Sequence, residues 1–139
     1  MGGADYKNLN IKILKVLEDF ENLKIIVVTT NSNKNLEQLK KYCKNKKWID
    51  LHINSNEIAT LMVQSNFAII TPSVTANEVY FMELPFMAIK VADNQKYMVE
   101  FLKDNDYTIF EEFDKHKIMI FCFNLLEEYN VKKISKSNN

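Results

Sequence analysis

The segment with the clearest chemical potential covers residues 71–78, between an apolar strand-like run and a helical pattern. Ser73 or Thr75 is placed to cap that helix, where free backbone N–H groups and the helix dipole form an anion site. Glu78 falls in about the first helical turn, where its carboxylate can accept hydrogen bonds from a pair of sugar hydroxyls. An ordinary capping arrangement, with Glu at the third helical position, explains the same residues. From spacing alone, we favour the capping interpretation over a ligand site.

Two further segments carry weaker signals. Gly2 and Gly3 precede the first helical pattern, where glycine lets backbone approach a ligand, although a flexible start of the chain explains them as well. Asp93, Asn94 and Gln95 open a later helix, where amides can hold a phosphate or sugar hydroxyls and where a simple cap fits equally well. All eighteen basic residues are lysine. A phosphate would therefore be held by backbone N–H groups, hydroxyls, amides or lysine rather than by an arginine fork.

The composition is that of one globular domain. The chain has 139 residues, of which 47% are hydrophobic and 26% charged, as in soluble proteins. Eighteen acidic residues cancel the lysines, so no general attraction to nucleic acid or to a membrane surface is expected. Residues 1–10 lack a signal-peptide pattern, and the longest apolar run, residues 118–123, is too short to cross a bilayer. We therefore expect no membrane span and a cytoplasmic location.

The cysteines and histidines do not form a metal-ligand pattern. Cys43 and Cys122 lie far apart in apolar helical patterns, which favours buried free thiols over a disulfide or a metal pair. His52 and His116 form no ligand cluster, so we expect no zinc site. His52 stands as a lone imidazole in a strand-like run and is interpreted as structural rather than catalytic.

Strand-like runs alternate with helical patterns along the chain. The expected strands cover residues 24–30, 49–53, 67–71, 85–91 and 107–110. The first is a continuous β-branched run, typical of a strand buried on both faces. This alternation predicts an α/β domain with a Rossmann-like parallel sheet, helices on both faces and ligands at the carboxyl ends of the strands. We expect residues 1–131 to form this nucleotide-sugar-binding domain and residues 132–139 a disordered tail.

The order of the candidate segments resembles a known family. Gly-Gly-Ala-Asp precedes the first helix, Asn77-Glu78 follows the strand at 67–71, and Asn94-Gln95 follows the strand at 85–91. This order resembles the carboxyl-terminal domain of the PseG-like UDP-sugar hydrolases of pseudaminic acid biosynthesis, over about residues 2–112. The resemblance implies the carboxyl-terminal half of a GT-B fold, similar to the MurG transferase. It also implies release of UDP from a 2,4-diacetamido-trideoxy sugar by water, in a pathway linked to flagellin glycosylation.

The resemblance implies binding roles for individual residues and no cofactor. Glu78 would hold the ribose hydroxyls, and the backbone of Ile53 would meet the uracil. The other implied positions lie around the diphosphate or the sugar: Gly2, Gly3, Ser73, Val74, Thr75, Asn94 and Gln95. The family's catalytic histidine belongs to the amino-terminal domain, and neither His52 nor His116 matches it. No catalytic residue is therefore assigned in this chain.

The start of the chain departs from the family pattern, because the strand expected before Gly2 and Gly3 is missing. That strand would lie between the strands at 24–30 and 67–71. We expect these two strands to pair directly, another segment to fill the gap, or two chains to associate through the exposed edges as a homo-oligomer. Association or a local rearrangement is favoured over a monomer with an open slot. We also expect the first helix to pack less firmly.

The function favoured by these arguments is the UDP-binding half of a PseG-like hydrolase. Such a half would be inactive without an amino-terminal half, for example one supplied as a separate chain. Two alternatives stay open: a non-catalytic domain that binds UDP-sugars or other proteins, and the nucleotide-binding subunit of a split GT-B glycosyltransferase.

Overall fold

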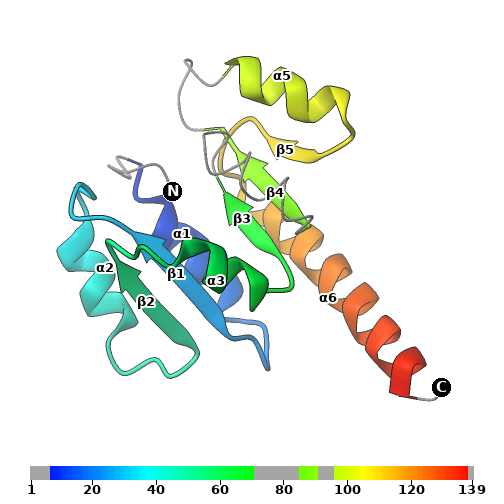
Figure 1. The fold of residues 1–139 in the computed structure, drawn as a ribbon, viewed down its shortest axis with the longest axis horizontal. Coiled ribbons are helices and arrows are strands. Elements are labelled where there is room, and N and C mark those ends of the chain that lie inside the picture. The colour runs from blue at the N-terminus through cyan, green and yellow to red at the C-terminus, as the bar shows by residue number, and fades with distance from the viewer. Residues whose placement is uncertain (1–6, 71–84, 91–95, 138–139) are drawn as a thin grey trace.

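The computed structural model describes residues 7–70, 85–90 and 96–137, and within them helices and strands alternate (Figure 1). The expected α/β class is confirmed. The elements, in chain order, are α1 (Leu9–Leu17), β1 (Ile25–Thr29), α2 (Leu36–Cys43), β2 (Ile49–Ile53), α3 (Ile58–Val63), β3 (Ala68–Ile70), β4 (Phe86–Ile89), α5 (Lys96–Asp104), β5 (Thr108–Phe110) and α6 (Lys115–Ser137).

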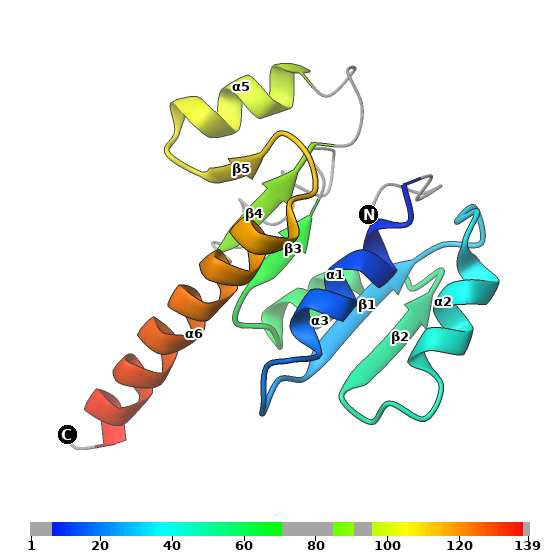
Figure 2. The same cartoon turned by 180° about the vertical axis from the view of Figure 1, so that it is seen from behind.

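The strands form two parallel groups. Strand β1 pairs with β2, from Ile25 opposite Ile49 to Thr29 opposite Ile53. Strand β4 lies between β3 and β5 and is parallel to both. Among the described strands, β1 and β3 do not pair, although they are neighbours across the fold (Figures 1 and 2). Within the described chain, the order β2–β1, then β3–β4–β5, is that of a Rossmann sheet without a strand at its central first position.

Helices cover both faces of these strands, as the sequence predicts. On one face, α1 and α6 meet β4 through a core that includes Leu9, Val16, Met87 and Ile118. Helix α2 adds Leu39 to a second cluster on the same face, around Val27 of β1. The opposite face carries α3 and α5, whose Met62 and Leu102 pack around Ile70 and Ala88.

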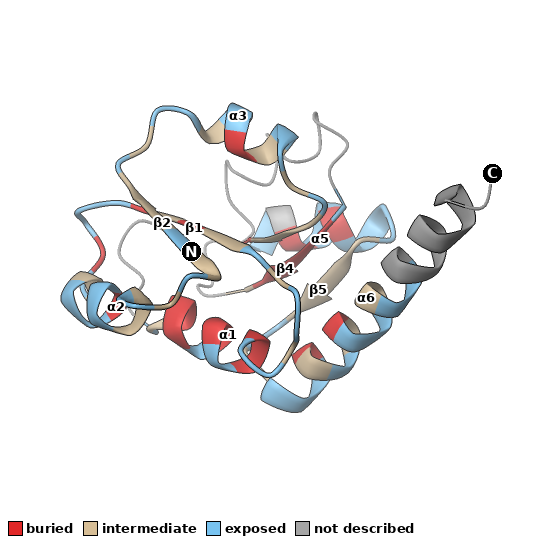
Figure 3. Cartoon of the chain, turned by 90° about the horizontal axis from the view of Figure 1, so that it is seen from below, coloured by how far each residue is buried: buried red, intermediate tan, exposed pale blue. Residues whose placement is uncertain are grey.

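Helix α1 is well buried in the described chain, and the expectation that it packs less firmly than it would beside a preceding strand stays a prediction. Seven of its nine residues are buried (Figure 3). Ile11 and Leu14 contact the β1–β2 group, whereas Leu9 and Val16 contact β4 and α6. The helix is apolar over most of its circumference, so it buries its side chains against both strand groups.

Strand β1 is less buried than its composition predicts. Val27 and Thr29 are buried, but Ile25, Ile26 and Val28 are only half-buried. By contrast, all four residues of β4 are buried, and β4 has a strand on each side. A buried parallel strand needs neighbours on both edges, and in the described chain β1 has one.

Helix α6 continues to Ser137, past residue 131, where we expected the folded domain to end. Helical backbone does not by itself define a domain, so the boundary at residue 131 and the tail at 132–139 stay predictions. Among the helices of the described residues, none is both long and apolar enough to cross a membrane.

Candidate functional site

Most of the residues proposed from sequence lie outside the described residues; Ile53 is the exception. The others are Gly2, Gly3, Ser73, Val74, Thr75, Glu78, Asn94 and Gln95. Residues 71 and 91 follow shortly after the ends of β3 and β4, and Ile53 ends β2. Because β3 and β4 are parallel, their carboxyl ends lie at one edge of their sheet. The described part of the candidate site is thus the carboxyl edge of β1 and β2.

A buried asparagine shapes the loop after β1. Thr29 ends the strand, and its Oγ1 accepts a hydrogen bond of 3.0 Å from Nδ2 of Asn33. Oδ1 of Asn33 accepts from the backbone N–H of Asn35 at 2.7 Å, just before α2 begins. Both Thr29 and Asn33 are buried, so the two hydrogen bonds satisfy polar groups that would otherwise be costly to bury. This arrangement fixes where the strand ends and the helix starts.

A second asparagine ties the loop after β2 to the end of β1. The backbone N–H of Asn54 donates to the carbonyl oxygen of Thr29 at 2.9 Å. Its side-chain Oδ1 accepts from the backbone N–H of Asn31 at 3.0 Å. Asn54 has a φ of 56°, a left-handed conformation that asparagine tolerates better than most residues. Sequence reasoning did not single out Asn33 or Asn54; for Asn54 the signal is an asparagine directly after a strand.

Ile53 presents backbone groups at this edge. The N–H of Ile25 donates to the carbonyl oxygen of Trp48, and the N–H of Asn54 donates to Thr29. Since backbone groups alternate in direction along a strand, the N–H and C=O of Ile53 point away from β1. Among the described residues they have no hydrogen-bond partner. The half-buried Ile53 therefore offers a donor and an acceptor beside the two ordered loops.

His52 is not a lone imidazole, which corrects the interpretation from sequence. Its Nε2 lies 3.0 Å from Oδ2 of Asp50, two positions earlier on the same face of β2. The side chains are 29% and 53% exposed. The pair lies on the face away from α1 and α2, because the neighbouring Leu51 packs with Leu39 on the other face. The structural interpretation of His52 stays a prediction. His116 is an exposed residue of α6.

The grouping and burial of the described thiols and carboxylates limit the chemistry that they can do. In the described part of the chain, no three His, Cys, Asp or Glu side chains are grouped so that they could hold a metal ion. Both cysteines are free, as predicted; Cys122 is buried, but Cys43 is only half-buried. Burial raises the pKa of the Cys122 thiol to about 11 and also raises the pKa of Cys43. Neither thiol is activated as a nucleophile.

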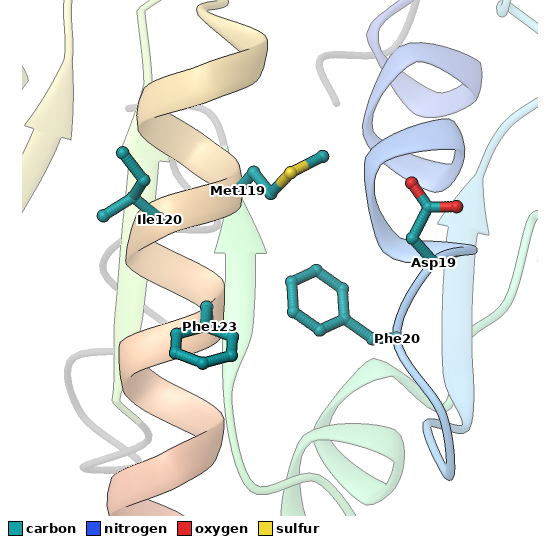
Figure 4. A pocket seen from close by; sticks show the side chains of 5 residues that line it. All are labelled: Asp19, Phe20, Met119, Ile120 and Phe123. Atoms are coloured by element: carbon teal, nitrogen blue, oxygen red, sulfur yellow. The ribbon is translucent and has the colours of Figure 1, made fainter.

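A pocket of the described residues lies away from the carboxyl edge, beside α6 and the chain that leaves α1 (Figure 4). It is lined by Asp19, Phe20, Met119, Ile120 and Phe123. Because helix α1 leads into the start of β1, its carboxyl end lies at the amino edge of the strands. The lining is apolar apart from Asp19, so this pocket does not suit a nucleotide.

No family model matches the sequence. The chain is 36% identical over 110 residues to the UDP-2,4-diacetamido-2,4,6-trideoxy-beta-L-altropyranose hydrolase of Campylobacter jejuni subsp. jejuni serotype O:2. The match covers 78% of this chain and 39% of the hydrolase. The chain thus spans well under half of that relative. This similarity relates the chain to a UDP-sugar hydrolase and supports the resemblance drawn from the sequence.

Proposed function

We propose that this chain binds UDP or a UDP-sugar at the carboxyl edge of its strands, as the nucleotide-binding part of a PseG-like hydrolase. The observation that carries the proposal is the 36% identity over 110 residues to the UDP-2,4-diacetamido-2,4,6-trideoxy-beta-L-altropyranose hydrolase. In this proposal the chain corresponds to the carboxyl-terminal half of a GT-B fold. The substrate is a UDP-linked 2,4-diacetamido-trideoxy sugar, and the enzyme works in the cytoplasm.

The geometry of the described edge supports nucleotide binding. The loops after β1 and β2 are held by Asn33 and Asn54, so backbone groups there are preorganised. Ile53 directs its N–H and C=O away from β1, where a uracil ring could pair with them. Ligands in parallel α/β sheets bind outside the carboxyl ends of the strands. Residues 71–78 and 94–95, to which the resemblance assigns the diphosphate and ribose contacts, including Glu78, follow β3 and β4 along the chain.

We further propose that the chain alone does not hydrolyse UDP-sugars at an enzyme's normal rate. Of the histidines, His52 is engaged with Asp50 on a sheet face and His116 is exposed on α6. A general base commonly contributes about 10²–10⁴-fold to a rate, and positioning in a closed cleft contributes more. An amino-terminal half, in the same or a separate polypeptide, would supply both. Its absence lowers turnover without abolishing UDP binding.

The test is a titration of isotope-labelled protein with UDP, followed by amide NMR. We expect shifts at Ile53 and within residues 73–78 and 94–95. At one hundred times its dissociation constant, UDP should stabilise the fold by about 2.7 kcal/mol, which a thermal shift would detect. Shifts confined to other surfaces, or no shift at millimolar UDP, would refute the site.

A matched pair of variants tests the assigned carboxylate. Glu78→Ala should weaken UDP binding by roughly 1–3 kcal/mol, because a charged acceptor is lost. Glu21→Ala removes an exposed carboxylate at the opposite edge, between α1 and β1, and should leave affinity unchanged. Equal losses in the two variants would point to a general charge effect. Release of UDP from a UDP-sugar at ordinary turnover by the purified chain would contradict the proposed inactivity while leaving the binding site intact.

A further inference from the structure

The outward side of α6 carries large apolar side chains. Ile120 and Phe123 are 62% and 52% exposed, and their spacing of three residues places them on one face of the helix. Met119 and Phe20 extend this apolar surface, because they line the same pocket beside α1 (Figure 4). Ile118 lies on the other side of the helix, in the core. Neighbouring exposed apolar side chains that border an apolar pocket mark an interaction surface.

Four exposed residues form one line along this side of α6. They are His116, Ile120, Phe123 and Glu127. Their spacing of four, three and four residues is that of the contact positions of a coiled coil. We call this line the α6 seam. Its middle is apolar and its two ends are polar, so a second helix packed along it would bury the middle and keep the ends at the rim.

The two ends of the seam carry opposite charge. At the amino end, Lys115 and Lys117 are exposed. Of the two glutamates just before the helix, Glu111 is already paired with two lysines of its own chain, which leaves Glu112 as the exposed carboxylate without an ion pair there. At the carboxyl end, Glu128 is exposed beside the seam and forms no ion pair with the described side chains. The seam therefore runs from a basic end to an acidic end.

We propose that the α6 seam is a self-association surface, along which the α6 helices of two copies of this chain pack antiparallel. Parallel packing would place Lys117 beside Lys117 and Glu128 beside Glu128, and like charges opposite one another are unfavourable. Antiparallel packing places Lys117 of each copy near Glu128 of the other. It also sets Ile120 of each copy against Phe123 of the other, so the apolar residues still meet at the centre. Each contact then occurs twice, as a two-fold dimer requires.

The same arrangement gives the apolar pocket an occupant and predicts weak pairing. Phe123 of the second copy would lie beside Ile120, which lines the pocket together with Phe20. Figures 1 and 2 show α6 extending well past the strands, which leaves room for a second helix along it. The seam is about 16 Å long, and such a short helix pair should bury less than the roughly 1,200 Å² of stable interfaces. The chain should therefore be monomeric in dilute solution and dimeric at high concentration.

The first measurement is analytical ultracentrifugation of the chain from micromolar to millimolar concentration. The weight-average mass should rise from that of a monomer toward twice that value and level off there. A monomer mass throughout this range would overturn the proposal. A mass that continues to rise past the dimer would overturn it as well, because two-fold pairing through one helix closes after two copies.

A matched pair of variants locates the surface. Phe123→Glu places a carboxylate at the centre of the seam and should raise the dissociation constant of the dimer at least about tenfold. Tyr97→Glu is the control, because Tyr97 is an aromatic residue of α5 that is 86% exposed, on the other face of the sheet. It should change the constant less than about twofold. Equal effects of the two variants would overturn the proposal. Circular dichroism at micromolar concentration checks that each variant is folded.

Charge reversal tests the antiparallel direction. Lys117→Glu and Glu128→Lys should each weaken the dimer about threefold or more, because each creates two contacts between like charges. The double variant should return to within about twofold of the original constant, since it exchanges the charges and keeps them complementary. In a parallel dimer the double variant would still oppose like charges, so failure to recover would overturn the proposal. Both positions are exposed, so this test holds even if Phe123→Glu does not fold.

Discussion

Replacing Ile118 by alanine tests how the two strand groups are held together. Strands β1 and β3 do not pair in the described chain, so side-chain packing links the groups, and α1 contributes to it by contacting β4 and α6 as well as the β1–β2 group. Ile118 of α6 is 0% exposed and belongs to this cluster. Its substitution should therefore destabilise both groups together.

The expected magnitude comes from burial. Ile118→Ala removes three fully buried carbon atoms at about 0.8 kcal/mol each, or about 2.4 kcal/mol. The cavity left behind raises the cost into the range of about 2–5 kcal/mol. For a domain of this size, each kcal/mol lowers the melting temperature by about 4 °C, so a decrease of about 8–20 °C is expected.

Ile120→Ala is the matched control. Ile120 lies two residues further along the same helix, on its opposite side, and is 62% exposed. The same change there removes less buried surface and should cost about 0.9 kcal/mol, partly offset by the better helix propensity of alanine. Equal losses for the two variants would show that the face of α6 has been assigned wrongly or that a partner covers Ile120.

The assay follows unfolding by two signals. Circular dichroism reports on the whole fold, whereas fluorescence of Trp48, the single tryptophan, reports on the cluster beside β2. Both midpoints should fall in Ile118→Ala, because α1 couples the two groups. A lower midpoint by circular dichroism with an unchanged fluorescence midpoint would refute the coupling through α1.

Three further outcomes follow from the contacts of single side chains. Burial, followed by the hydrogen bond from its hydroxyl to Glu18, raises the pKa of Tyr42. The stability contributed by the neutral hydroxyl is therefore complete below about pH 10 and is lost as the pH rises through the raised pKa. Tyr42→Phe should remove this alkaline loss of stability from a series of melting curves. In the native protein, iodoacetamide should alkylate Cys43 faster than the buried Cys122. In denaturant the two thiols should react equally fast, as mass spectrometry would show. Faster reaction of Cys122 in the native protein would contradict its burial. Asn33→Ala should cost about 1–3 kcal/mol because the buried hydroxyl of Thr29 loses this hydrogen bond, whereas Asn31→Ala, at an exposed position, should cost under about 0.5 kcal/mol by urea unfolding.

The sequence determined the class of the fold because local patterns are read directly from it. Residues 24–30 form a β-branched run, and the structure has β1 at Ile25–Thr29. The strand predicted at 49–53 matches β2. Strands that alternate with helices favour parallel pairing with helices on both faces, and the structure shows both features in its two strand groups. The ordering of the short motifs also led to the hydrolase to which the chain is similar.

Only the tertiary structure decided how the chain responds to the open central position. The sequence left direct pairing, filling and association as alternatives, because strand pairing depends on contacts between distant residues. In the described chain β1 and β3 stay unpaired, and α1 is buried against both groups. The partner of His52 and the roles of Asn33 and Asn54 likewise needed coordinates. Periodicity tells which face of an element is apolar; which other element covers that face is decided by packing in three dimensions.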